Sequence, residues 1–424
     1  MRNRIIDILK NTDGLSDWKV NSVRTESTEL FFVHKSLETV RGTDTTDIKV
    51  TLYVLHDGKL GEATFSVYAS YDDTKIKEEI EKAKKKANIV GNQPYSIPEN
   101  EQGEFVSKSN FASYRPHELA SLIAEACFDA DCVEGGSLNA TEIFVYKDVI
   151  SIINSRGVDK TQIKYRAMVE AIPTFNGNES VELYEQYNFT EFNRELVKGE
   201  IASKMTEVRD RYEAKPPVEK LCCPVILSAP ELEQLFDNYI GSLNFSSVYQ
   251  HSNAFSVGDD IQKDAKGDRI TLTMCGSVTG SVRSSSFDSD GVTLVDRKII
   301  DAGKASALWG GTRFAQYLGK HATGNLGCLS VECGTLTDEQ KASAPYFRCA
   351  SMSGLQVDIY NDYIGGEVRL GYYFDGEREI PVTGISISGK LSVALANMRL
   401  SCDATTYESY RGPKCALFEG IEIV

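Results

Sequence analysis

The sequence contains few histidines and no long apolar run. Because catalytic zinc sites draw mainly on imidazole and thiolate ligands, so few imidazoles argue against a His-rich metal site. No apolar stretch approaches the length that a helix needs to cross a bilayer, and the N-terminus lacks the uninterrupted apolar segment of a secretory signal. We therefore expect a cytoplasmic protein without membrane contact, whose cysteines are reduced thiols. The five histidines are His34, His56, His117, His251 and His321.

Several signatures of common enzyme classes are also missing. The sequence contains no P-loop, no G-x-G-x-x-G dinucleotide turn and no G-x-S-x-G nucleophile elbow. None of its ten cysteines forms a C-x-x-C pair, so a structural zinc site is not expected. The net charge of −15 repels phosphate backbones, which argues against nucleic-acid binding. Nothing in the residue spacing favours a Ser/His/Asp triad.

One His-Glu pair does occur, in the stretch PHELASLIAEA from Pro116 to Ala126. Zinc peptidases place a second His about one turn after such a pair, so that both imidazoles project from one face towards one metal. One turn after His117 the sequence has Ser121 and Leu122, which are not usual zinc ligands. The apolar residues recur at the i, i+3, i+4, i+7 spacing of an ordinary amphipathic helix, which is what we expect here.

The composition is typical of a folded protein with more than one domain. Hydrophobic residues make up 41% and charged residues 25%, as in globular proteins rather than disordered ones. A chain of 424 residues is long for one core and predicts two domains, residues 1–215 and 216–424. We place the boundary after a long helical segment, because Pro216 and Pro217 cannot continue a helix.

The first half predicts a sheet with helices packed on it. Alternating β-branched and aromatic residues in Trp18–Ala69 indicate antiparallel strands, and the apolar spacing in Asp73–Asn88 indicates a helix. A second pair of strands flanks the turn at Arg156-Gly157. The long helix before the boundary has an apolar stripe that includes Leu196 and Met205. We expect an N-terminal strand-rich α/β domain.

The second half is rich in strands and in glycine. A strand ending near Ser228 leads into a helix at Pro230–Ser242, and mostly strands and turns follow. Dense glycine is typical of curved, bulged or closely approaching strands. We expect a mostly antiparallel, Gly-rich, barrel-like domain, and hence an α+β fold overall.

The segment TGNLG, from Thr323 to Gly327, surrounds an Asn with glycines. Such a segment is typical of a tight turn, because Gly and Asn tolerate the left-handed region. It is also compatible with a loop whose backbone lies against a ligand or partner. The residue types alone favour the turn.

Five segments, in this order, resemble the TldD/PmbA family, known as peptidase subunits and earlier described as modulators of DNA gyrase. No single segment is decisive, but five in the same order are fairly specific. They are NSRG followed by YRAMVEAI (from Asn154), SNAFSVGDDI (from Ser252), the stretch ending in TGNLG, VTGISISGKLSVALANM (from Val382) and GPKCALFEGIEI (from Gly412).

The resemblance implies a choice between two branches of the family. The TldD branch carries H-E-x-x-x-H on a helix near the start of the second domain, and a Cys near the C-terminus completes its zinc site. Counted back from Phe255, this motif falls near Phe236, Asp237 and Gly241. However, no His occurs between Pro224 and Gln250. Cys415 could match the C-terminal Cys. The resemblance is therefore to the PmbA branch, also called TldE, which lacks the histidines.

The resemblance implies a non-catalytic subunit that pairs with a TldD-type zinc peptidase to degrade or mature unfolded or modified peptides. An extended peptide would be held by strand addition, with zinc only in the partner and no cofactor in this chain. The candidate chamber-lining residues are Thr323, Gly324, Asn325 and Gly327. Two alternatives stay open: a stand-alone hydrolase using Cys415 or an unrecognised metal site, and a homodimeric peptide-binding module.

Overall fold

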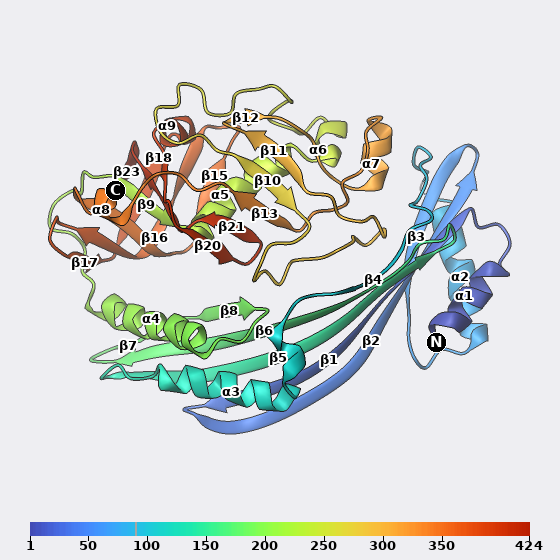
Figure 1. Cartoon of the computed structure of the whole chain (residues 1–424), viewed down its shortest axis with the longest axis horizontal. Helices are drawn as coiled ribbons and strands as arrows, with labels where there is room; N and C mark the ends of the chain where they lie inside the picture. Colours follow the sequence, from blue (N-terminus) through green and yellow to red (C-terminus); the bar gives the residue numbers. More distant parts are fainter. Residues whose placement is uncertain (90) are drawn as a thin grey trace.

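The computed structural model describes residues 1–89 and 91–424 of the chain. Within them, the N-terminal half forms an eight-stranded, strongly curved sheet, and the C-terminal half forms two further sheets that lie over part of it (Figure 1). Helices and strands occur in both halves, so the expected α+β class is confirmed. No helix in the described residues is both long enough and apolar enough to span a bilayer.

Four long strands build the N-terminal sheet, whose order is β3-β2-β1-β5-β6-β4, with β7 and β8 also paired to β6. All pairs are antiparallel except β4 with β6. The expected hairpin is present, since β5 pairs with β6 across a turn in which Gly157 adopts a φ of +89°. The strands are β1 (Asp17–Val33), β2 (Ser36–His56), β3 (Lys59–Val67), β4 (Gln102–Val106), β5 (Gly136–Asn154), β6 (Asp159–Asn176), β7 (Ser180–Glu182) and β8 (Glu185–Phe189).

Helices cover this sheet near its two ends, α1 and α2 at one and α3 and α4 at the other (Figure 1). The helix α2 buries the predicted apolar face, and α3 is the helix expected in PHELASLIAEA. The stripe of α4 was predicted wrongly in part: Met205 is buried, but Leu196 is exposed and Val197 packs inwards instead. The helices are α1 (Arg2–Lys10), α2 (Asp73–Ala87), α3 (Pro116–Asp129) and α4 (Arg194–Glu213), with a short 3-10 turn η1 (Asn110–Ser113).

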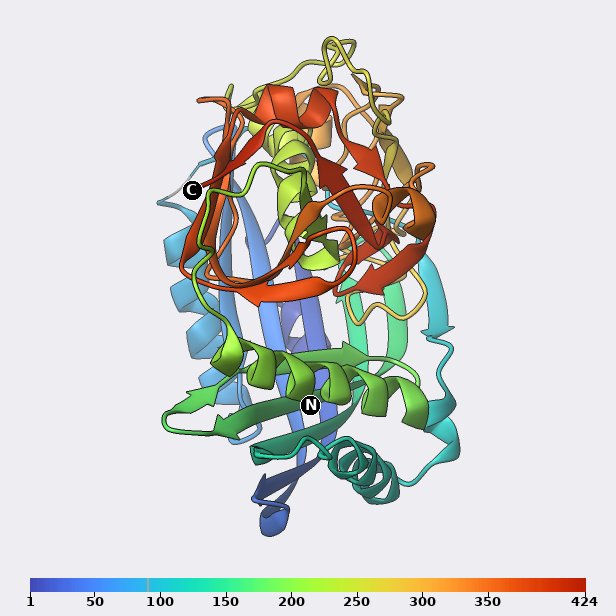
Figure 2. The same ribbon diagram turned by 90° about the vertical axis from the view of Figure 1, so that its left-hand side faces the viewer.

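The C-terminal half packs two sheets around one buried helix, α5 (Ala229–Ser242). Apolar residues of α5 share a single core with strands of both sheets, and Figure 2 shows this helix in the middle of the C-terminal half. Pairing is mostly antiparallel, as expected, although β9 (Val225–Ser228) with β14 (Tyr346–Met352) and β13 (Cys328–Val331) with β21 (Tyr410–Pro413) run parallel.

The first of these sheets has the order β12-β11-β10-β13-β21-β20, and the second β19-β22-β9-β14-β16-β18-β23, with β15 and β17 paired to β16. The remaining strands are β10 (Leu272–Cys275), β11 (Arg297–Asp301), β12 (Lys304–Ala305), β15 (Gln356–Asp358), β16 (Tyr363–Phe374), β17 (Glu379–Val382), β18 (Ile385–Gly389), β19 (Arg399–Leu400), β20 (Ala404–Tyr407), β22 (Cys415–Phe418) and β23 (Ile421–Ile423). The remaining helices are α6 (Phe245–Tyr249), α7 (Thr312–Tyr317), α8 (Asp338–Lys341) and α9 (Leu391–Ala396).

A buried lysine of the N-terminal sheet ties the two halves together. The ammonium of Lys160, on β6, donates to the carbonyl oxygen of Gly291 and to the hydroxyl of Thr293, both at 2.7 Å, and forms an ion pair with Glu101. Because this side chain is only 1% exposed, the loop around Gly291 is held directly against the sheet.

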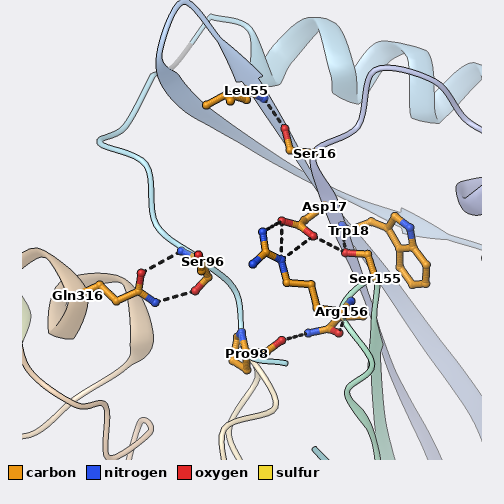
Figure 3. A network of polar contacts seen from close by, with 10 residues as sticks. Ser16, Asp17, Trp18, Leu55, Ser96, Pro98, Ser155, Arg156 and Gln316 are labelled. Atoms are coloured by element: carbon orange, nitrogen blue, oxygen red, sulfur yellow. Dashed lines mark hydrogen bonds and ion pairs between the residues drawn. The ribbon is translucent and has the colours of Figure 1, made fainter. Parts of the chain in front are cut away.

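Figure 3 shows a second set of contacts, around the β5–β6 turn. The guanidinium of Arg156 binds both carboxylate oxygens of Asp17 on β1, and the Asn154 amide donates to the carbonyl oxygen of Pro98. Nearby, Gln316 of α7 exchanges two hydrogen bonds with the backbone of Ser96. The NSRG segment thus fixes the hairpin turn against β1 and the loop that meets the C-terminal half.

Candidate functional site

A charged cleft of about 510 Å³ lies between the two halves of the chain. One wall comes from α4 and β8, and the other from the start of α5 and from strands β14, β20 and β22. Its charged lining residues are of both signs, and they come from segments far apart in the sequence. They are Glu185, Glu200, Lys204, Glu207, Glu231, Asp338, Lys341, Arg348, Asp403 and Lys414.

Burial makes two carboxyl groups of this cleft unusually basic. Desolvation raises the pKa of Glu185 to about 7, and it also raises the pKa of Glu231 to about 7. Burial by itself lowers the pKa of Lys204, but the carboxylates of Glu207 and Glu185 outweigh it and raise that pKa. The cleft therefore presents a fixed ammonium beside carboxyl groups that exchange protons near neutral pH.

Cys415 lies in the same cleft, on β22, directly opposite Ser228 of β9 in the strand register. Burial raises the pKa of its thiol, and the cations of Lys341 and Lys414 offset this only in part. A thiol acts as a nucleophile in its thiolate form, usually beside a His. No histidine lines this cleft among the described residues. The lining of the cleft thus gives Cys415 no activating imidazole.

We expect Cys415 to react with iodoacetamide several-fold more slowly than the exposed Cys402 in the native chain. The reason is that the Cys415 thiol is buried with a raised pKa, so little thiolate is available at neutral pH. Quantitative peptide mass spectrometry after short labelling times measures both rates in one sample. Preferential labelling of Cys415 would contradict this expectation.

The residues at the expected position of the zinc motif lie on α5, but outside the cleft that contains Cys415. Phe236 points into the core and is 0% exposed. Asp237 and Gly241 line a separate groove of about 510 Å³, beside residues 356–360. The structure therefore brings Cys415 together with the first turn of α5, and it brings Asp237 together with Gly241, but the two groups line different cavities.

The TGNLG segment is a loop held by the buried Asp288. The carboxylate of Asp288 accepts hydrogen bonds from the backbone and side-chain amides of Asn325, at 3.0 and 3.3 Å. Gly324 has a φ of +78°, and a Cβ there would lie 2.4 Å from Leu294, so only glycine fits. Thr323 and Gly324 are buried, whereas Asn325 and Gly327 are exposed. The segment is an irregular loop, bridged to Gly310 through Gly324, and it presents two of its residues to solvent.

The residues present do not suit a catalytic zinc ion. Such a site needs about three protein ligands, usually imidazole, thiolate or carboxylate, around an open position. Over residues 1–89 and 91–424, no three His, Cys, Asp or Glu side chains are grouped to hold a metal ion. The cleft that Cys415 lines contains serines, glutamates and lysines but no imidazole. We therefore derive no chemical step through zinc in this chain.

The C-terminal half, which carries α5 and Cys415, matches a known family. Residues 220–424 match the model of the PmbA/TldA metallopeptidase C-terminal domain. This match confirms the resemblance to the TldD/PmbA family for the C-terminal half of the chain. Four of the five sequence segments lie within the matched residues. No curated protein matches the chain.

Comparison with solved structures shows a similar fold over the whole length of the chain. TldE from Thermococcus kodakarensis superposes with a TM-score of 0.80 at 17% identity, covering 100% of this chain and 99% of that one. A candidate modulator of DNA gyrase from Thermotoga maritima superposes with a TM-score of 0.76 at 15% identity, covering 100% of this chain and 99% of that one. A second candidate modulator of DNA gyrase, from Bacteroides thetaiotaomicron, superposes with a TM-score of 0.78 at 16% identity, covering 100% of this chain and 97% of that one. At these identities the likeness shows the fold.

The sequence did not indicate the ionisable residues of the cleft. Glu185 and Lys204 belong to the N-terminal half and Glu231 to the C-terminal half, so no local spacing connects them. The only available signal was the S-x-x-E pattern from Ser228 to Glu231, which marks a helix start. In the structure the Glu231 carboxylate accepts a hydrogen bond from the backbone amide of Ser228 at 3.2 Å.

Proposed function

We propose that this chain is the non-catalytic subunit of a two-chain peptidase, paired with a zinc-bearing member of the TldD/PmbA family. One observation supports this most directly: the start of α5 and the neighbouring Cys415 offer no imidazole for zinc. The structural likeness to TldE agrees with the same role. The complex would degrade or mature unfolded or modified peptides, and zinc would reside in the partner.

In this role, an extended peptide pairs with strand edges and contacts the exposed part of the TGNLG segment. Strand addition draws affinity from main-chain hydrogen bonds, so it suits substrates of varied sequence. Asn325 and Gly327 are the residues of the segment that are open to a ligand, and Thr323 and Gly324 hold its backbone against Gly310. The inter-half cleft, with its paired charges, would position the two halves rather than cleave.

Peptide cleavage by the single chain and by the pair tests this proposal. An unstructured peptide is incubated with this chain, with its zinc-bearing relative and with both, each with and without a chelator. We expect the single chain to be inert and the pair to cleave in a chelator-sensitive manner. In the pair, Cys415→Ser should leave the rate unchanged, as should the control Cys402→Ser at an exposed site.

The other outcomes separate the alternatives. Chelator-resistant cleavage by the single chain, lost in Cys415→Ser but not in Cys402→Ser, would establish a thiol hydrolase. Chelator-sensitive cleavage by the single chain would establish a metal site within it. If the zinc-bearing relative is equally active with and without this chain, the paired-subunit role is wrong and a homodimeric peptide-binding module becomes the better description.

A further inference from the structure

Two buried cysteines face each other where two strands of the C-terminal half meet. Cys275 is the last residue of β10 and Cys328 is the first residue of β13, and the antiparallel register places them directly opposite each other. They are 6% and 0% exposed, and their side chains pack in one small cluster with Val278. Directly opposed residues of an antiparallel pair have Cα atoms about 4.5–5.5 Å apart, which lies within the range that a disulfide spans.

The backbone beside this pair can adjust to a bond between the two sulfur atoms. Gly276 follows Cys275 and Gly327 precedes Cys328, so a glycine adjoins each cysteine at the end of the paired strands. Glycine has the widest range of backbone dihedrals. The small shift that brings two opposed thiols to bonding distance therefore meets little resistance from the chain beyond the two strands.

The sulfur of Cys328 lies beside two hydroxyl groups. Its Sγ atom is 3.5 Å from Oγ of Ser281 and 3.9 Å from Oγ of Ser284. The Ser281 hydroxyl accepts a hydrogen bond from the backbone amide of Arg283, so its own proton can be donated to the sulfur. A hydrogen bond donated to the sulfur stabilises the thiolate relative to the thiol.

The two thiols differ in their electrostatic surroundings. Burial lowers the pKa of Lys164 on β6, and the negative charges of Asp148 and Cys328 oppose that effect, so the lysine lies within electrostatic reach of the sulfur. A nearby ammonium favours the thiolate, which is the reactive form. At Cys275, burial raises the pKa of the thiol to about 12, with the charges of Asp296 and Cys328 adding to the effect. Cys328 is therefore the thiol that reacts first.

A polar cavity of about 400 Å³ adjoins this pair. Lys164, Ser281 and Ser284 line it, and the two serines also contact the sulfur of Cys328. A small oxidant such as hydrogen peroxide in this cavity lies one side chain away from that sulfur. The burial of both thiols disfavours attack by a bulky oxidant such as a peptide disulfide.

We propose that Cys275 and Cys328 form a peroxide-sensitive dithiol, which oxidises to a cross-strand disulfide and returns to two thiols with a dithiol reductant. The bond would tie the TGNLG segment, which ends at Gly327, to the end of β10. The proposal concerns the chain by itself and does not depend on the proposed peptidase role.

The oxidation takes two steps. The Cys328 thiolate first attacks one oxygen of hydrogen peroxide and the O–O bond breaks; the leaving hydroxide takes up the proton that the thiol released, which gives water and a sulfenic acid. The sulfur of Cys275 then attacks the sulfur of Cys328. The S–S bond forms, the S–O bond breaks, and the departing hydroxide leaves as a second water with the proton of Cys275. The two thiols lose two electrons and the peroxide gains them.

Disulfide mapping on the full, reduced chain tests the proposal. The chain is exposed to hydrogen peroxide in small molar excess, its remaining thiols are alkylated under denaturing conditions, and its peptides are analysed without reductant. We expect a peptide pair linked through Cys275 and Cys328, about 2 Da lighter than the two thiol peptides together, which dithiothreitol separates again. The exposed Cys132 is the reference thiol in the same sample and should be oxidised several-fold more slowly.

Two cysteine substitutions assign the order of the steps. In Cys275→Ala the sulfenic acid on Cys328 meets no second thiol, so dimedone should label Cys328 after peroxide treatment. In Cys328→Ala, dimedone should leave Cys275 unlabelled. Lys164→Met should slow the oxidation of Cys328 several-fold. Its matched control is Lys108→Met, at an exposed position of the same cavity, which should oxidise like the wild type.

Three results would overturn the proposal. In the first, Cys275 and Cys328 both remain open to alkylation while the exposed Cys132 is oxidised. In the second, dimedone labels Cys275 in Cys328→Ala as heavily as it labels Cys328 in Cys275→Ala. In the third, the two lysine variants oxidise at the same rate. The first readout uses the unaltered chain, so it stands even if a substituted chain fails to fold.

Discussion

We expect Lys160→Met to lower the free energy of unfolding by about 3 kcal/mol, within the range for removing a charged donor from a buried network. The ammonium serves three acceptors, the Glu101 carboxylate, the Gly291 carbonyl and the Thr293 hydroxyl. Methionine fills a similar volume, so the loss reports hydrogen bonds and charge rather than a cavity. Glu101 keeps some solvent contact, which limits the cost of leaving its carboxylate unpaired. Urea denaturation followed by circular dichroism measures the change.

The control for this substitution is Lys49→Met, on the exposed surface of the same sheet. An exposed lysine typically contributes within about 0.5 kcal/mol, so the two variants should differ clearly. Limited proteolysis adds a local readout. Because Lys160 holds the loop at Gly291 against the sheet, cleavage in that loop should accelerate in Lys160→Met alone. Equal stability of the two variants would show that the contact contributes little.

Phe236→Ala is the second substitution with a large expected effect, a loss of about 3–5 kcal/mol in the free energy of unfolding. The side chain is 0% exposed in the core around α5. Its ring lies nearly parallel to that of Tyr410, at a centroid distance of 6.3 Å. Truncation removes the buried ring and leaves a cavity between α5 and β21. Chemical denaturation measures the loss.

Asp237→Ala is the matched control, because it changes the next residue of the same helix on its exposed side. We expect its free energy of unfolding to stay within about 0.5 kcal/mol of the wild type. Comparing the two variants distinguishes the effect of a core residue from that of the surface residue next to it. A small effect of Phe236→Ala would mean that the core around α5 tolerates a large cavity, contrary to the packing observed.

Local patterns predicted much of the fold because the forces that decide them act over a few residues. The alternation in Trp18–Ala69 correctly predicted the strands β1, β2 and β3. The pair Pro216-Pro217 correctly predicted the end of the long helix, since α4 ends at Glu213. The error at Leu196 has a similar origin. Leu196 and Val197 are neighbours and both apolar, and packing against α3 selected the face with Val197 and Ile201.

The site was less predictable, because its parts meet only through long-range pairing. Cys415 faces Ser228 because β22 pairs with β9, and no spacing in the sequence contains that information. Likewise, the raised pKa of Glu185 depends on burial under the C-terminal half, which a sequence pattern cannot show. The family resemblance indicated the correct domain, but it could not place individual residues on the faces of α5.

The sequence by itself determined the α+β class, the family resemblance and the lack of imidazoles near α5, since these depend on residue types and local order. The tertiary structure decided which residues share a cleft, which side of α5 is buried and which cysteines face each other across two strands. Those features arise when distant segments pair and exclude water, so their energies depend on contacts that no local window of the sequence contains.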